Sequence, residues 1–270
     1  MPASELFRSR AAEAERLAAV VREAGAIALK FFRGELKSWT KGEARSPVSE
    51  ADIAVNDLLQ QLLPQPGDGW LSEESENDPT RLQASRVWVV DPIDGTRAYI
   101  AGREDWSVSV GLVEGGRPTV AALFAPATDE MFLATAGGGA TRNGVAIRAG
   151  TGPDVNGARV AGPKRIQDWL TARYPELVPM PRIHSLALRL TRVATGELDA
   201  AIAGGNGHDW DLAAADLLVH ETGGLLTSLD GQPLIYNRPD PVHSTLLAAG
   251  GARHAALIEL LRAQAREAAA

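Results

Sequence analysis

Two carboxylates and a hydroxyl follow directly on the apolar run 87–90, in the segment DPIDGT that contains Asp91, Asp94 and Thr96. If that run is a buried strand, the carboxylates lie at the carboxyl edge of a sheet, where layered α/β folds usually bind their ligands. The proline between them and Gly95 after them predict a tight turn, which would let the carboxylates converge and leave the amides of Gly95 and Thr96 free to bind an anion. The segment fits a metal site, although an Asx turn that caps a short helix explains the same residues.

Two further acidic clusters favour the metal interpretation. Glu73 and Glu74 lie in LSEES, after the apolar pair Trp70 and Leu71, so a pair of carboxylates again lies at a predicted strand end. Asp211 lies in HDWDLAAADLLVHETGG, at the start of a predicted helix that stops at a Gly-Gly pair. A helix cap also explains Asp211, and Asp209 can equally serve as that cap. Hard oxygen donors of this kind favour Mg²⁺ over zinc or copper.

The composition limits the kind of protein. The chain has 270 residues, 45% hydrophobic and 23% charged, which suits one large or two small globular domains. Its net charge of −7 opposes non-specific attraction to nucleic acid or anionic lipid. No apolar run approaches the roughly 20 residues that span a bilayer, and the first residues lack the apolar core of a signal peptide. We expect a cytoplasmic protein with a small-molecule partner, and any metal must be held by oxygen or histidine because cysteine is absent.

The acidic clusters need helices and strands to bring them together. Apolar residues at helical spacing predict a helix over 4–33, and a second helix begins at Ser49, with Asp52 at the capping-box position, and ends at Pro64. The segments VWVV, WSVSVGLV, TVAALFA and EMFLATA predict an antiparallel meander, and the Asn-Gly pair at 143–144 predicts a tight turn.

After about residue 150 the pattern changes to single strands that alternate with helices. We therefore predict an α+β domain over 1–150, which holds most of the metal ligands, and an α/β domain over 151–270, which contributes Asp211 and substrate-side residues. The helices expected in the second domain lie near 185–195, 210–221 and 252–268.

Five segments together resemble the inositol monophosphatase superfamily of magnesium-dependent, lithium-sensitive phosphatases, and the resemblance covers nearly the whole chain. It implies a layered αβαβα sandwich, a homodimer and inhibition by Li⁺. The segments are SPVSEAD at 46–52, LSEES at 71–75, WVVDPIDGT at 88–96, GGGATRNG at 137–144 and WDLAAADLLVHETGG at 210–224.

The resemblance implies two or three Mg²⁺ ions, all held by oxygen. The implied ligands are Glu73, Asp91 and the Ile93 carbonyl for one ion, Asp91, Asp94 and Asp211 for a second, and Asp52 near a weaker third.

The implied reaction is attack on phosphorus by a water molecule that a metal activates and that Glu73 and the Thr96 hydroxyl orient. Glu73, Asp94 and Thr96 are the predicted catalytic residues, and the amides of Gly95 and Thr96 would hold the phosphate oxygens. Lys41 resembles a family lysine, although a solvated loop lysine is an equal alternative.

The substrate side departs from the family pattern. His184 replaces a usual glycine, Ser185 is retained, and Arg189 stands where many relatives carry an acid. With Arg97 and Asp211, these residues are the predicted substrate contacts, and the basic ones suit a second phosphate. For Arg97, a solvated helix residue is an equal alternative.

The segments LSEES, DGTR and FAPATDEMF resemble the sequences of the CysQ-like branch of 3'(2'),5'-bisphosphate nucleotidases. We therefore predict hydrolysis of adenosine 3',5'-bisphosphate to AMP and phosphate. The alternatives are an inositol-1-monophosphatase, a histidinol-phosphatase, which DGTRAYI also resembles, or a regulatory protein that binds metal and phosphate without turnover.

Overall fold

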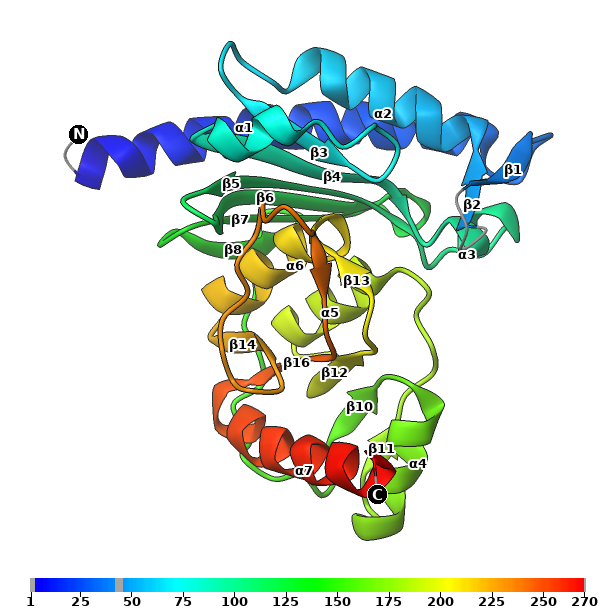
Figure 1. Ribbon diagram of the computed structural model, residues 1–270, viewed down its shortest axis with the longest axis vertical. Coiled ribbons are helices and arrows are strands. Elements are labelled where there is room, and N and C mark those ends of the chain that lie inside the picture. The colour runs from blue at the N-terminus through cyan, green and yellow to red at the C-terminus, as the bar shows by residue number, and fades with distance from the viewer. Residues whose placement is uncertain (1–2, 42–45, 270) are drawn as a thin grey trace.

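The computed structural model describes residues 3–41 and 46–269, and its helices and sheets lie in alternating layers (Figure 1). A helix pair covers a seven-stranded sheet, a second helix pair lies beneath that sheet, and a five-stranded sheet with its own outer helices completes the stack. The order helix, sheet, helix, sheet, helix confirms the predicted αβαβα sandwich.

The first layer consists of α1 (Ala3–Phe31) and α2 (Glu50–Leu62), which lie side by side over the seven-stranded sheet. Their apolar sides join the sheet in one hydrophobic cluster, in which Val21 is fully buried. The second helix begins after Ser49, as predicted, because the backbone N–H and the hydroxyl of Ser49 both donate to the Asp52 carboxylate.

The seven-stranded sheet has the order β3-β4-β5-β6-β7-β8-β9. The first pair is parallel and every other neighbouring pair is antiparallel, which confirms the predicted meander. Asn143 and Gly144 form the last tight turn with φ of 49° and 79°, the left-handed values that a type I′ hairpin needs. The strands are β3 (Gly69–Ser72), β4 (Arg86–Asp94), β5 (Ser107–Glu114), β6 (Arg117–Ala125), β7 (Glu130–Thr135), β8 (Gly139–Arg142) and β9 (Val145–Ala146).

The middle layer consists of α5 (Leu186–Ala194) and α6 (Asp209–Glu221), which confirm two predicted helices. The second of these packs on β4, β5 and β6. Small residues allow a close approach, since a Cβ added to Gly111 would lie only 3.1 Å from the Cβ of Ala213.

The second sheet has the order β11-β10-β12-β16-β14, and α4 (Lys164–Arg173) and α7 (Gly251–Ala269) cover its outer face (Figure 1). The sequence analysis did not predict α4, whose short apolar stripe of Ile166, Trp169 and Leu170 includes Leu170 as its single fully buried residue. The strands are β10 (Arg159–Ala161), β11 (Val178–Pro179), β12 (Ala200–Ala203), β14 (Gly224–Ser228) and β16 (Leu246–Gly250). The remaining short elements are β1 (Ser38–Lys41), β2 (Ser46–Ser49), η1 (Pro79–Gln83), α3 (Thr96–Ile100), η2 (Pro126–Thr128), β13 (Gly207–His208) and β15 (Val242–His243).

The predicted boundary near residue 150 coincides with the passage of the chain from the first sheet to the second. One hydrophobic cluster nevertheless joins both halves: it includes Val89 and Leu123 of the first sheet, Leu190 and Leu218 of the middle helices, and Ala248 of the second sheet. The division into two domains therefore stays a prediction.

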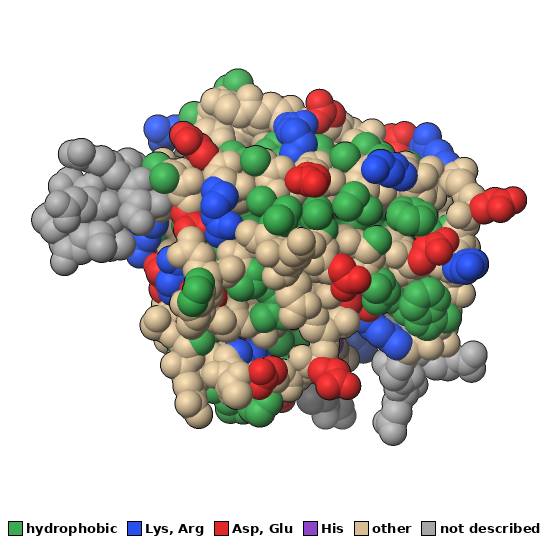
Figure 2. Space-filling view, turned by 90° about the horizontal axis from the view of Figure 1, so that it is seen from above, with side chains coloured by type: hydrophobic (Ala, Val, Ile, Leu, Met, Phe, Trp, Pro, Cys, Tyr) green, Lys and Arg blue, Asp and Glu red, His purple; other side chains and the backbone are tan. Residues whose placement is uncertain are grey.

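The outer face of the α1 and α2 layer carries hydrophobic, basic and acidic side chains in a mixed pattern (Figure 2). Over the described part of this face, opposite charges alternate, so the face does not present one continuous field of positive charge. Within residues 3–41 and 46–269, no helix combines the length and the apolar character needed to cross a bilayer.

Candidate active site

The end of β4 brings two carboxylates to the same side of the sheet. In a regular strand Asp91 and Asp94 would point to opposite faces, because side chains alternate. The pairing with β5 shifts here, since Asp91 pairs with Ser109 and Asp94 with Ser107, so that three steps along β4 oppose two along β5. This bulge turns both carboxylates toward the N-terminus of α6. The predicted convergence is confirmed, with a bulge in addition to the expected turn as its cause.

The helix α6 supplies the third carboxylate. Its N-cap is His208, whose backbone N–H donates to Asp211 Oδ2 at 2.6 Å. One oxygen from each of Asp91, Asp94 and Asp211 lies within 4.8 Å of the others. Asp209, the alternative cap, is fully buried and bonded away from this cluster. The structure therefore brings together two of the three predicted acidic clusters at a single point.

The two carboxylates of β4 differ in their hydrogen bonds. Asp91 Oδ1 is buried and has no partner among the described residues. Asp94 accepts from the Ser185 hydroxyl at 2.6 Å, from the Ala187 amide at 2.6 Å and from the Leu186 amide at 3.1 Å. Ser185 is itself fully buried as the N-cap of α5. Its hydroxyl lies behind Asp94 and outside the cavity described below, which differs from the substrate contact that the sequence predicted.

Buried negative charge accumulates at this point. Burial raises the pKa of Asp91 well above its usual value, and Glu73, Asp94 and Asp211 raise it further. Burial likewise raises the pKa of Asp211, and Asp94 adds to that effect. Such a cluster is unfavourable unless a cation or protons compensate it. Three hard oxygen donors, one with an unpartnered oxygen, fit the coordination preferences of Mg²⁺.

Glu73 reaches the same site from the end of β3. Burial raises its pKa to about 7, Lys41 opposes the rise, and nearby carboxylates add to it. The Lys41 ammonium donates to the Glu73 backbone carbonyl at 2.9 Å and lies 3.7 Å from its carboxylate. Lys41 is therefore part of the acidic site, and the alternative of a solvated loop lysine is wrong.

The Thr96 hydroxyl is held from behind by two acceptors. It donates to the Ile93 carbonyl at 3.1 Å and lies 3.3 Å from Asp52 Oδ1. Burial raises the pKa of Asp52 to about 6, and the hydrogen bonds from Ser49 lower it. Asp52 belongs neither to the carboxylate cluster nor to the cavity lining. Ser49 donates to one of its oxygens and the Thr96 hydroxyl lies next to the other, so a ligand role for Asp52 at a third ion stays a prediction.

Two backbone amides next to the cluster are free to bind an anion, as the sequence predicted. Gly95 has a φ of 94°, and an added Cβ would lie 3.1 Å from both the Asp105 carbonyl oxygen and the Ser185 nitrogen. In the described part of the chain, neither the Gly95 amide nor the Thr96 amide donates to a protein acceptor. These donors lie at the start of α3, next to the carboxylates.

A cavity of about 210 Å³ joins these groups. The predicted substrate contact Arg97 is exposed at this cavity. The ring of His184 is oriented by Asp105, which lies 2.7 Å from Nδ1 and accepts from the His184 amide at 2.8 Å. The acidic side of the lining consists of Glu73, Asp91, Asp94 and Asp211, and the basic side of Arg97, Arg182 and His184.

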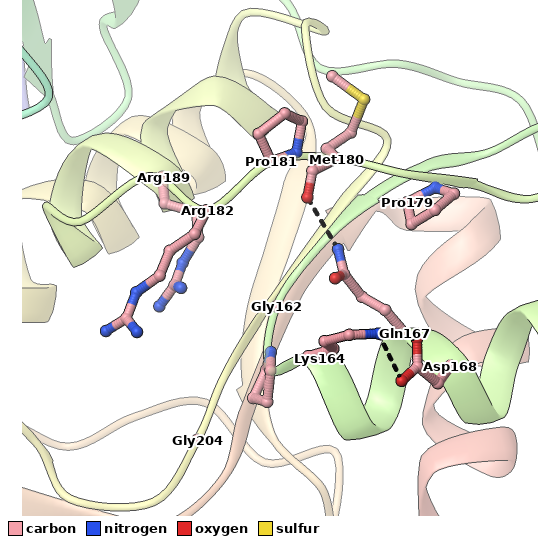
Figure 3. A pocket seen from close by; sticks show the side chains of 11 residues that line it. Gly162, Lys164, Gln167, Asp168, Pro179, Met180, Pro181, Arg182, Arg189 and Gly204 are labelled. Atoms are coloured by element: carbon pink, nitrogen blue, oxygen red, sulfur yellow. Dashed lines mark hydrogen bonds and ion pairs between the residues drawn. The ribbon is translucent and has the colours of Figure 1, made fainter.

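A second cavity of about 660 Å³ adjoins the first, and Arg189 lines this one alone. The structure therefore separates Arg189 from Arg97 and His184, with which the sequence analysis grouped it. Arg182 lines both cavities and was missed (Figure 3). A usable signal was present in PMPRIHS, since a basic residue in the loop before a serine-capped helix lies near that helix's N-terminus.

The sequence profile of the Inositol monophosphatase family matches residues 10–266. The chain belongs to the inositol monophosphatase family. Like other inositol monophosphatase family proteins, it is a phosphoric monoester hydrolase.

Known relatives of this inositol monophosphatase family member carry several substrate names. The chain is similar to a 3'-phosphoadenosine 5'-phosphate phosphatase of Mycobacterium bovis, with 33% identity over 243 residues that cover 83% of this chain and 84% of that protein. It is similar to a histidinol-phosphatase of Mycobacterium tuberculosis, with 34% identity over 217 residues that cover 75% and 82%. Its structure resembles an inositol monophosphatase from Anabaena (Nostoc), with a TM-score of 0.75, 25% identity, and coverage of 94% and 96%.

Proposed function

We propose that this phosphatase hydrolyses a bisphosphorylated nucleoside, adenosine 3',5'-bisphosphate, to AMP and phosphate in a magnesium-dependent reaction. The observation that carries the proposal is the composition of the small cavity, where a buried carboxylate cluster faces two free amides and three basic side chains. The carboxylates suit cations at the scissile phosphate, and the basic groups suit a further anionic group on the same substrate.

The proposed ligands are Glu73, Asp91 and the Ile93 carbonyl for one Mg²⁺, and Asp91, Asp94 and Asp211 for another. When bound, Mg²⁺ supplies the positive charge that these carboxylates lack toward a phosphate dianion and lowers the pKa of water. We place Asp52 behind Thr96, where it holds the threonine hydroxyl, and we leave a third ion as a weaker proposal.

Four groups of the chain would share the work on the scissile phosphate. The Thr96 hydroxyl, fixed by Ile93 and Asp52, orients the attacking water, and Glu73 accepts its proton. The amides of Gly95 and Thr96 hold two phosphate oxygens and stabilise charge as it develops.

The basic side of the site favours the bisphosphate over the two alternatives. Arg97, Arg182 and His184 line the cavity within reach of a bound ester. Inositol 1-phosphate and histidinol phosphate carry no second phosphate for such groups. The name of the Mycobacterium bovis relative supports the same substrate class.

A phosphate-release assay with three esters at equal concentration tests the proposal. With Mg²⁺ present, we expect adenosine 3',5'-bisphosphate to have a kcat/KM at least about tenfold above those of inositol 1-phosphate and histidinol phosphate. A preference for either monophosphate would contradict the proposal and assign the protein to the branch of the family that hydrolyses that ester. No release from any ester would favour the regulatory, non-catalytic alternative.

Two further expectations rest on family membership. We propose that Li⁺ inhibits turnover by competing with Mg²⁺ at the carboxylate cluster, which a Li⁺ titration at several fixed Mg²⁺ concentrations tests. Homodimerisation also stays a prediction, and a monomeric mass in solution scattering would remove it.

A further inference from the structure

Two arginine side chains in the larger cavity have no acceptor among the residues that the structure describes. Arg182 lies in the loop before α5 and Arg189 in the first half of that helix. Figure 3 shows the two side chains side by side, ending with their guanidinium groups next to one another. Within the described chain, neither one forms a hydrogen bond or an ion pair, and the Nε of Arg189 is fully buried without a partner. Two guanidinium groups, each with five N–H donors, thus line one cavity without an acceptor for their side chains among the described residues.

Two neighbouring cations differ from this arginine pair because each is paired with a carboxylate. Arg192, three residues further along α5, forms a close ion pair with Glu130. Lys164, on the opposite side of the same cavity, forms an ion pair with Asp168 at 2.8 Å (Figure 3). Each of these cations forms an ion pair with a carboxylate, whereas Arg182 and Arg189 form no ion pair with any described residue.

The pairing of two like charges is unfavourable without an anion. Burial lowers the pKa of Arg189; Asp94 and Asp211 oppose that effect, and Arg182 adds to it. The two carboxylates act only at a distance, because neither lies within ion-pair range of Arg189. Arg182 is exposed and keeps contact with water, whereas the buried Nε of Arg189 has no acceptor among the described residues. An anion that binds Arg189 would remove this unfavourable burial of an unpaired donor.

The location of the pair points to the substrate as the source of that anion. Arg182 lines both the acidic cavity and the larger one, so the two spaces are neighbours at its side chain. Gly162 and Gly204 line one side of the larger cavity, and Met180, between two prolines, contributes apolar lining (Figure 3). A ligand with one phosphate at the carboxylate cluster can therefore extend past Arg182 into this space.

We propose that Arg182 and Arg189 form a clamp for the distal, non-reacting phosphate of a bisphosphorylated substrate. Two adjacent guanidinium groups offer the forked donors that match phosphate oxygens. This inference rests on the proposed function and names the residues that confer its substrate class. It also replaces Arg97 and His184 as the principal contacts for the second phosphate.

A matched pair of substrates isolates the distal phosphate. Adenosine 3',5'-bisphosphate and adenosine 3'-monophosphate differ by that group alone. For Arg182→Met and Arg189→Met, we expect kcat/KM to fall at least about tenfold on the bisphosphate and less than about twofold on the monophosphate. Lys164→Met is the control, because it removes a cation from the same cavity whose charge is already paired with Asp168.

Binding of AMP in EDTA provides a readout that is independent of turnover, since AMP keeps only the distal phosphate. Calorimetry should detect binding to the wild type and to Lys164→Met, and at least a tenfold weaker interaction with each arginine variant. Equal losses on both substrates, unchanged AMP binding in the arginine variants, or an equal loss in Lys164→Met would overturn the clamp. If no ester is hydrolysed at all, the proposed function fails, while AMP binding still decides whether the clamp exists.

Discussion

Asp91 and Asp94 are identical side chains three residues apart, and their hydrogen bonds give them different parts in the site. The carboxylate of Asp94 is fully engaged with the N-terminus of α5, whereas Asp91 Oδ1 is buried without a partner. Removing the charge should therefore have opposite effects on stability at the two positions.

We expect Asp91→Asn to stabilise the metal-free protein. The substitution removes a charge that burial and four neighbouring carboxylates disfavour, and it breaks no hydrogen bond to the described residues. Thermal unfolding in EDTA should give a Tm at or above the wild-type value, together with loss of the Mg²⁺-induced increase in Tm. A lower Tm in EDTA would show that Asp91 has a structural partner after all.

Asp94→Asn should instead destabilise the protein. Both carboxylate oxygens accept from protein donors, so the amide nitrogen of asparagine must face one of them. We expect a loss of about 1–3 kcal/mol in the free energy of unfolding, besides the loss of turnover. Urea denaturation in EDTA measures it, and Asp91→Asn is the matched control.

The raised pKa values of Glu73 and Asp52, about 7 and about 6, predict a pH dependence of the metal-free protein. Because each value lies above its usual level near 4, the stability that protonation provides is fully present at pH 4 and is lost as pH rises to about 7. The Tm in EDTA should fall over this range, and the increase in Tm caused by Mg²⁺ should grow, since the ion replaces protons. Glu73→Gln should reduce the slope, and an unchanged slope would contradict the assigned pKa.

At this scale the sequence predicted the identity of the acidic groups because their types and spacing are local properties. It could not predict the roles of Ser185 and Arg182. Ser185 was predicted as a substrate contact because this chain retains the serine of the family's substrate-side segment, and its burial depends on how α5 meets β4. PMPRIHS carries a local signal for Arg182 near the N-terminus of α5, but its position between two cavities exists only in the folded chain.

At the scale of elements, the distance between β5 and α6 sets the geometry of the carboxylate cluster. Gly111 lets Ala213 approach, and Asp211 lies only two residues before Ala213 on the same helix. The strands and helices themselves were predictable from periodicity, since most follow clear apolar patterns. The bulge in β4 was not, because it depends on the register with β5.

We expect Gly111→Val to weaken Mg²⁺ binding without altering any ligand. The new side chain would contact the Ala213 Cβ and the Ala214 nitrogen and push the N-terminal half of α6 away from the sheet. Calorimetry should show at least a severalfold loss of affinity. Val110→Ala, on the opposite face of β5, is the control and should lower stability while leaving the affinity near the wild-type value.

For the whole molecule, the layer order was predicted from the resemblance rather than from the residues. Periodicity alone indicated an antiparallel meander and then alternating strands and helices, without a rule for stacking them. The placement of α6 between two sheets joins hydrophobic residues of both halves into one cluster. That contact depends on distant parts of the chain and leaves no local signal.

The carboxylates of β4 and α6 are separated by roughly 120 residues of chain, so an ion held between them closes a very long loop. Such an ion acts as a removable crosslink that forms only in the folded chain. Resistance to proteases should consequently rise and fall with free Mg²⁺, and limited proteolysis with and without EDTA would show whether it does. The lifetime of the protein would then depend on the same ion as its chemistry. A shortage of magnesium would both stop turnover and make the protein more susceptible to proteolysis.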